Sequence, residues 1–339
     1  MRAIKIEKPW DVACVELEKP VAKEGEALIK VKSAGICGSD IGAFRGVNPL
    51  VSYPRLIGHE IVGEVLEIGE NERGIQVGDH VIVDPYIYCD DCYPCSIHRT
   101  NCCTDLKVLG VHIEGGMAEY LTHPANMLWK LPKDMDLDLA PIAEPLTIAL
   151  HGIHRGRLKE GEFVAIIGAG PIGLLAAMSA LAYGAKPIMI DVVKERLDFA
   201  KELGVAYVIQ SGIEDVKEKV LEYTNGQGAE LVMECSGANA AIRSTLELVA
   251  NAGRITLTGW PKVETPLPTD LITKKEVDIM GARTSANEFE EAIELLYTGK
   301  VDGRKILTKV VSMEETPDII RDIEKNPGDY MKVNVRMGD

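Results

Sequence analysis

The sequence predicts an α/β protein of two domains, one rich in β-strands and one built around a doubly wound parallel sheet. Its 339 residues exceed the roughly 100–200 that a single domain usually takes. Short β-like runs separated by Gly and Pro fill the first 140 residues, and strands alternate with helices from Phe163 onward. About forty residues follow the last expected helix. They are too few for a third domain, so we expect them to pack on the first.

Each domain shows its elements by its own periodicity. Apolar and charged residues alternate from Ala27 to Ser33, and similar β runs recur at residues 60–68 and 80–83. Residues 163–191 read as strand, Gly turn, helix and strand, which is a βαβ unit. The pattern continues through helix 194–203, strand 207–209, helix 215–223, strand 230–235, helix 240–250, strands 254–258 and 277–281, and a helix from 287 to 297. Six strands alternating with helices predict a doubly wound parallel sheet.

Charge and composition exclude several classes of protein. The 37 Lys and Arg against 52 Asp and Glu give a net charge of −15, which repels phosphate backbones and anionic lipids, so nucleic acid and membrane surfaces are not expected partners. The N-terminal twenty residues lack an apolar stretch of signal-peptide length, so we expect a cytoplasmic protein. Residues 163–183 carry no charge, but three Gly and one Pro interrupt them, which fits a strand–turn–helix better than a membrane span.

Gly168, Gly170 and Gly173 form a G-x-G-x-x-G motif between a buried strand and a helix. In that context the motif predicts a dinucleotide site. The first Gly allows the tight turn, the second lets the backbone approach a pyrophosphate, and the third lets the helix pack closely on the strand. Pro171 and Ile172 begin the helix, whose N-terminus offers free N–H groups to the phosphates.

Asp191 ends the second strand of this unit, 18 residues after Gly173. A carboxylate there binds ribose hydroxyls and repels a 2′-phosphate, which favours NAD over NADP. Arg196 could soften that preference, although a solvated helix charge is the more ordinary interpretation. We also expect Ser236, Thr258 and Arg283 to bind the cofactor.

Five of the eight Cys fall within residues 89–103. Cys89, Cys92, Cys95 and Cys103 supply four thiolates on one loop, which suits a closed structural zinc site. Adjacent residues rarely both bind one metal, so we choose Cys103 over Cys102 as the ligand. An iron–sulfur cluster is the alternative, but the ferredoxin motif continues x3-Cys-Pro and this chain does not. Disulfide bonds among these four cysteines would require an export signal, so the sequence favours the metal site over disulfides.

A second group of possible ligands is dispersed along the chain: Cys37, His59, Glu60 and Glu144. A catalytic zinc needs about three protein ligands and one open position, and one Cys, one His and one Glu meet that need. Each residue alone also has an ordinary interpretation, as a buried thiol, a core histidine or a solvated carboxylate. The four make a site only if the fold brings their segments together.

Several motifs in combination resemble the zinc-dependent medium-chain dehydrogenase family over essentially the whole chain. They are ICGSD at 36–40, GHE at 58–60, the four-Cys loop, GVHIEGGMAEY at 110–120, AEP at 143–145 and GAGPIG at 168–173. The pair GHE and AEP resembles the sorbitol and threonine dehydrogenase branch. SYPRLIGHE and RTNCC are most similar to bacterial sugar-acid enzymes of the L-galactonate 5-dehydrogenase type. The resemblance implies a GroES-like catalytic domain at 1–145 and 286–339 and a Rossmann NAD-binding domain at 146–285.

The resemblance also implies roles for matching residues. Cys37, His59 and Glu60 would hold the catalytic zinc, with Glu144 binding it directly or through its water. Ser39 would take the proton of the alcohol. Many relatives carry a His five residues after the catalytic Cys, where this chain has Gly42. The outer half of the proton relay therefore lacks its imidazole.

These observations predict reversible hydride transfer between NAD and a secondary alcohol, with zinc as Lewis acid. The expected substrate is a sugar acid, because Arg45, Arg55 and Arg283 lie near the motifs of the site and a guanidinium binds a carboxylate in bidentate fashion. Each arginine also has an ordinary interpretation: Arg45 as a charge on the surface, Arg55 as a residue that stabilises its own loop, and Arg283 as a contact to the cofactor pyrophosphate. The alternatives are a polyol or L-threonine dehydrogenase and, from another class, a non-catalytic NAD-binding sensor. We expect a homo-oligomer, either a dimer or a tetramer.

Overall fold

The structure, a computed structural model, describes residues 1–338 and divides the chain into two compact units. The first unit comprises residues 1–144, 289–297 and 303 onward, and the second comprises residues 145–288 and 298–302. The boundaries expected from the sequence differ from these most clearly at 298–302, which group with the second unit. Within residues 1–338 no helix has the length and apolar character needed to cross a lipid bilayer.

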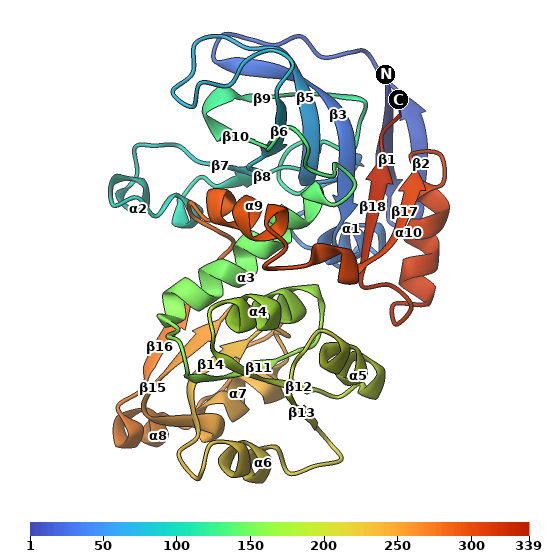
Figure 1. The fold of residues 1–339 in the computed structure, drawn as a ribbon. Coiled ribbons are helices and arrows are strands. Elements are labelled where there is room, and N and C mark those ends of the chain that lie inside the picture. Colours follow the sequence, from blue (N-terminus) through green and yellow to red (C-terminus); the bar gives the residue numbers. More distant parts are fainter. Residues whose placement is uncertain (339) are drawn as a thin grey trace. The chain divides into compact units, whose positions relative to one another are not determined.

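The first unit is built on a seven-stranded sheet in the order β10-β6-β5-β3-β18-β17, with β9 on β3 (Figure 1). Strand β18, the last strand of the chain, lies antiparallel to β3, with Val335 opposite Ala34. The C-terminal segment therefore packs on the first domain, as expected. Ile29 and Val31 are buried in the core, while Lys30 and Lys32, which alternate with them, are half-buried; this explains the alternation in the sequence. The elements are β1 (Arg2–Lys8), β2 (Asp11–Glu16), β3 (Glu26–Ile36), α1 (Gly38–Phe44), β4 (Arg55–Leu56), β5 (Glu60–Glu67), β6 (His80–Val83), β7 (Tyr86–Ile87), α2 (Tyr93–Ser96), β8 (Lys107–Val108), β9 (Tyr120–Pro124), β10 (Leu128–Lys130), α9 (Phe289–Tyr297), β17 (Leu307–Ser312), α10 (Thr316–Lys325) and β18 (Lys332–Arg336).

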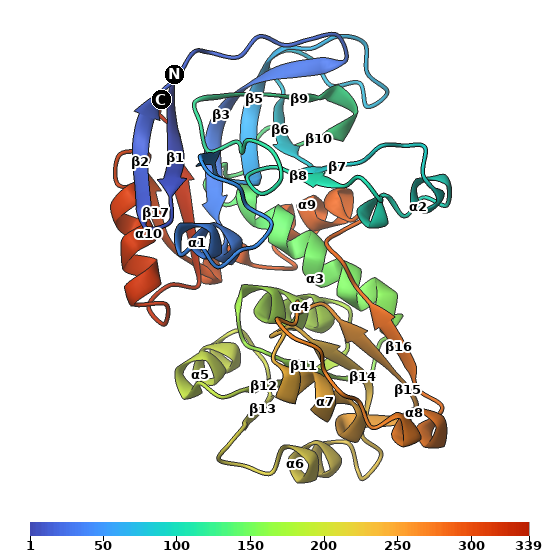
Figure 2. The same ribbon diagram turned by 180° about the vertical axis from the view of Figure 1, so that it is seen from behind.

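The second unit is a six-stranded parallel sheet in the order β13-β12-β11-β14-β15-β16, as the sequence predicts. Because parallel crossovers are right-handed, α4 and α5 cover one face and α6, α7 and α8 cover the other (Figure 2). The uncharged segment 163–183 forms β11, the Gly turn and α4. The elements are α3 (Ala143–Gly156), which starts in the first unit, β11 (Phe163–Ile167), α4 (Pro171–Ala182), β12 (Lys186–Asp191), α5 (Lys194–Glu202), β13 (Tyr207–Gln210), α6 (Val216–Tyr223), β14 (Ala229–Glu234), α7 (Asn239–Leu248), β15 (Val249–Leu257), α8 (Thr269–Lys275) and β16 (Asp278–Gly281).

Candidate active site and metal centres

The four thiols of the loop at 89–103 converge on one point. The Sγ atoms of Cys92 and Cys95 lie 3.4 Å apart, those of Cys89 and Cys103 3.4 Å, and those of Cys92 and Cys103 3.9 Å. A tetrahedral zinc with Zn–S bonds of about 2.3 Å requires neighbouring sulfurs about 3.8 Å apart, so the four thiols fit that metal. Among the described residues Cys102 is outside this group, in agreement with the choice of Cys103.

A second cluster consists of Cys37, His59 and Glu60, whose ligand atoms all lie within 4.8 Å of one another. Strands β3 and β5 pair with Gly35 opposite Glu60, so the residue after β3 meets the residue before β5. Any Cβ at Gly35 would lie 1.8 Å from Glu60 Oε2, so only glycine leaves room for this carboxylate. His59 and Glu60 are buried and Cys37 is half-buried. One Cys, one His and one Glu with a partly exposed side are a donor set that suits an open zinc site.

Asp40 holds the backbone around this cluster. Its Oδ2 accepts a hydrogen bond from Cys37 N at 2.9 Å, and its Oδ1 accepts one from Gly58 N at 3.3 Å. The first of these bonds caps α1, and Asp40 Oδ1 also lies 3.9 Å from His59 Nδ1. Asp40 therefore fixes the two segments that carry the Cys and His ligands. On the same helix Ser39 Oγ lies 3.5 Å from His59 Nε2.

The two carboxylates at the cluster have different surroundings. Glu60 pairs with the ammonium of Lys332, which is buried on β18 and also donates to Ile36 O at 3.1 Å. Burial would lower the pKa of Lys332, but the charges of Glu60 and Cys37 raise it above its ordinary value, so the lysine stays charged. Glu144, in the first turn of α3, lies outside the compact group of three. Burial raises its pKa to about 7 against the opposing charge of His59, and Tyr86 donates a hydrogen bond to it.

The glycine motif of the second unit has the geometry of a cofactor turn. Gly168 adopts φ +106°, which favours glycine, and a Cβ at Gly173 would lie 1.8 Å from Gly168 O. These two glycines are therefore required by the protein itself. Gly170, at the N-cap of α4, would place a Cβ in open space. The space that Gly170 leaves open is where a pyrophosphate would approach the backbone.

Asp191 lies at the end of β12 beside that turn. Its Oδ2 accepts a hydrogen bond from Ala169 N at 2.6 Å, and its Oδ1 accepts one from Val193 N at 2.8 Å. It lines a hollow of about 270 Å³ at the carboxyl ends of the strands, together with Gly168, Ser211, Ser236 and Ser244. Ligands of doubly wound sheets bind at that edge.

The remaining expected cofactor residues are more scattered. Thr258 follows β15, and its backbone N–H donates to Glu234 O at 2.9 Å. Arg283 follows β16 and is half-buried, and Arg196 is half-buried on α5. Neither arginine is among the residues that line the hollow beside Asp191.

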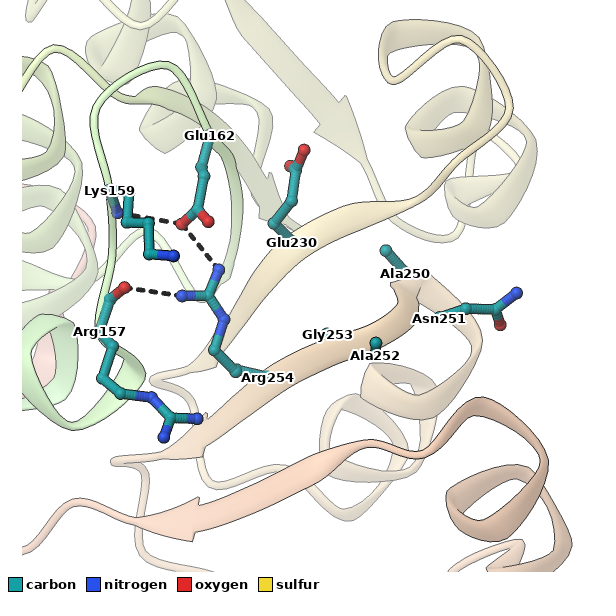
Figure 3. A pocket seen from close by; sticks show the side chains of 9 residues that line it. All are labelled: Arg157, Lys159, Glu162, Glu230, Ala250, Asn251, Ala252, Gly253 and Arg254. Carbon is teal, nitrogen blue, oxygen red and sulfur yellow. Dashed lines mark hydrogen bonds and ion pairs between the residues drawn. The ribbon is translucent and has the colours of Figure 1, made fainter.

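A further hollow of about 460 Å³ lies at the amino ends of the strands, between Glu162, Glu230 and the start of β15 (Figure 3). Arg254 Nη2 pairs there with Glu162 Oε2 at 2.7 Å, and its Nη1 donates to Arg157 O at 2.6 Å. The guanidinium of Arg157 pairs with Asp278. Because its arginines are already paired and it opens at the edge opposite to the ligand edge, we place no function in this hollow.

The two arginines expected near the substrate differ in their engagement. Arg55 is buried on β4, where its Nη2 donates to Ser52 Oγ at 2.6 Å and its Nη1 lies 3.5 Å from Glu114 Oε1. Arg45, just after α1, has a side chain 51% exposed and lies 3.9 Å from Glu324. Arg55 is thus engaged with its own loop, while Arg45 is the more available of the two.

Sequence reasoning missed three residues of the first unit that touch the expected site. Asp40 lies inside the ICGSD motif, and its place three residues after Cys37 is typical of a helix cap. Lys332 is the first residue of a strand that reads KVNVR, in which charged and polar residues alternate with valine, so the pattern does not indicate a buried charge. Nothing in the sequence around Tyr86 indicates that its hydroxyl reaches Glu144, which is 58 residues away.

Family models and known proteins match the sequence and fold of this chain. The model described as alcohol dehydrogenase GroES-like domain matches residues 23–133, and the model described as zinc-binding dehydrogenase matches residues 171–298. An uncharacterized zinc-type alcohol dehydrogenase-like protein of Haemophilus influenzae is 54% identical over 98% of both chains. The crystal structure of an Escherichia coli alcohol dehydrogenase with NADH superimposes with a TM-score of 0.93, at 36% identity over 99% of both chains.

Relatives with named substrates lie at lower identity. L-galactonate-5-dehydrogenase of Escherichia coli is 36% identical over 91% of both chains. L-threonine 3-dehydrogenase of Pyrococcus horikoshii is also 36% identical, over 91% of this chain and 90% of its own. These identities do not separate the sugar-acid enzymes from the threonine enzymes.

The fold and the two ligand clusters define a zinc-dependent oxidoreductase that acts on CH–OH groups. The chain belongs to the zinc-containing medium-chain alcohol dehydrogenase family.

Proposed function

We propose that this protein oxidises a secondary hydroxyl of a sugar acid reversibly, with NAD as the hydride acceptor. The observation that carries the proposal is the cluster of Cys37, His59 and Glu60, in a chain that also has an open glycine turn. A non-catalytic NAD-binding sensor would have no need to keep these ligands together with Ser39 and Glu144.

The residues of the site have separate tasks. Cys37, His59 and Glu60 would hold the zinc, which would supply a Lewis acid for the substrate hydroxyl, and the glycine turn would hold the NAD that takes the hydride. Ser39 Oγ takes the hydroxyl proton, next to His59 at 3.5 Å. Glu144, which lies outside the group of three, would bind the zinc directly or through a water molecule.

The hollow beside Asp191 supports NAD over NADP. A 2′-phosphate placed there would face a carboxylate that is only 9% exposed and held by two backbone N–H groups. Such a fixed charge cannot turn away, so the repulsion is strong. The NADH bound to the Escherichia coli structure is consistent with this preference.

The substrate class rests on Arg45 and on the relatives that act on galactonates. The Arg45 side chain is 51% exposed and its ion pair with Glu324 is 3.9 Å long, so the guanidinium is accessible to a substrate carboxylate. The runner-up is an L-threonine or sorbitol dehydrogenase, as other relatives are named.

We also propose that the protein forms a homo-oligomer, a dimer or tetramer, which light scattering would test.

A substrate panel with the purified protein and NAD tests the proposal. We expect kcat/KM for hexonates to exceed that for sorbitol, L-threonine and simple alcohols at least about tenfold, or roughly 1.4 kcal/mol. Arg45→Ala should erase much of that margin, while Arg304→Ala, an exposed arginine of the same unit, should not. Faster turnover of sorbitol or L-threonine than of every sugar acid would favour the runner-up.

A further inference from the structure

Tyr86 belongs to two parts of the first unit at once. Its ring packs in a small apolar core with Cys95, Cys103 and Leu106, which is the core of the four-cysteine lobe. Its hydroxyl donates a hydrogen bond to Glu144 Oε1 in the first turn of α3. Tyr86 and Glu144 are 6% and 1% exposed, so the contact is shielded from water.

The backbone of Tyr86 is fixed on several sides. In β7 it pairs with Val108 of β8, and its N–H donates to Asp84 Oδ1 at 3.1 Å. The carbonyl of Asp84 in turn accepts a hydrogen bond from the buried His123 at 2.8 Å. A tyrosine held at its backbone and packed at its ring places its hydroxyl at one point.

Glu144 faces a crowded set of charges. His59, Glu60 and Lys332 all act on it electrostatically, yet it lies outside the compact group of ligands. A buried carboxylate in that position is attracted by His59 and Lys332 and repelled by Glu60, and a donor that holds one of its oxygens limits where it can turn. The Tyr86 hydroxyl is such a donor, because it donates its hydrogen bond to Glu144 Oε1.

We propose that Tyr86 is a positioning residue that holds Glu144 at the catalytic zinc and thereby couples the four-cysteine lobe to the active site. This inference rests on the proposed role of Glu144 in that site. It gives the four-cysteine zinc an indirect part in the reaction, because the lobe that it folds carries Tyr86.

Tyr86→Phe removes the hydroxyl alone, and Tyr88→Phe is the matched control. Tyr88 is half-buried and packs against the same small core, two residues further along the chain. The catalytic site is loaded with Co²⁺ while zinc stays in the closed site, and its visible spectrum and metal affinity are measured. Loss of a partner that orients a ligand shell typically costs about 10–100-fold in affinity or activity, and we expect a loss in that range together with a changed spectrum. Tyr88→Phe should match the unmodified protein.

A double-mutant cycle with Glu144→Ala shows whether Tyr86 acts through Glu144. Once Glu144 is removed, Tyr86→Phe should change neither the Co²⁺ spectrum nor the affinity further. An equal effect in both backgrounds, a Tyr86→Phe spectrum like that of the control, or loss of the fold or of the four-cysteine metal in Tyr86→Phe would each overturn the inference. A site left unchanged by Glu144→Ala itself would instead refute the proposed role of Glu144.

Discussion

Replacing Asp191 with alanine should change both cofactor choice and stability, because its carboxylate has two tasks. It lines the hollow at the carboxyl ends of the strands, where we propose that the cofactor ribose binds, and it accepts hydrogen bonds from Ala169 N at 2.6 Å and Val193 N at 2.8 Å. Removing the charge should cut the preference for NAD over NADP. Removing the acceptors should loosen the glycine turn that carries Ala169.

The structure sets the size of the second effect. The bond to Ala169 is buried, and leaving its N–H unsatisfied costs about 1–3 kcal/mol. The bond to Val193 is partly exposed, so water can replace much of it. We expect a total loss near 2 kcal/mol, or about 4–8 °C in the melting temperature of a unit of this size. Asp191→Asn keeps one acceptor oxygen and should lose about half as much.

Calorimetry without cofactor and the ratio of kcat/KM for NAD and NADP separate the two effects. Both variants should lose cofactor discrimination, while Asp191→Asn should stay more stable than Asp191→Ala. If the unmodified protein already uses NADP as well as NAD, the discriminating role of Asp191 is wrong. An Asp191→Ala protein that melts at the same temperature would refute the structural role.

Other predictions concern the metal sites, the proton path and acid stability. Cys37→Ala should abolish turnover with little change in melting temperature, whereas Cys92→Ala should lower the melting temperature because its metal supplies folding energy; equal losses in both would contradict the two roles. A Cβ at Gly42 would lie 3.7 Å from Asn48 Cβ, so Gly42→His has room at its Cβ. This variant should add a limb near pH 6.5 to the pH profile of the rate, where the unmodified protein has none from this position. An unchanged profile would mean that protons leave by another route. Burial lowers the pKa of His123 from 6.5 to about 4. Because the unfolded chain binds the proton more readily, the contribution of this neutral histidine to the free energy of unfolding is complete above pH 6.5 and is lost on acidification toward pH 4, about 3 kcal/mol in all. In urea unfolding His123→Gln should show a smaller loss of stability over this pH range, and an equal loss would assign it to other groups.

The sequence by itself determined the elements whose signals are local. Alternation of apolar residues located β3, the uncharged segment with its glycines located β11 and α4, and the Cys spacing from Cys89 to Cys103 located one metal loop. Each of these depends on residues close together in the chain, where periodicity and spacing carry the information. The parallel sheet could be predicted for the same reason, whereas the packing of the C-terminal segment on the first domain was predicted from its length, which is too short for a domain of its own.

The tertiary structure alone decided which distant side chains meet. Cys37, His59 and Glu60 converge because β3 and β5 pair at Gly35 and Glu60. Lys332 reaches Glu60 across 272 residues of chain, and Tyr86 reaches Glu144 across 58. Local propensity contains no term for such contacts, since a buried charge or hydroxyl is partnered only when folding has removed water from both groups.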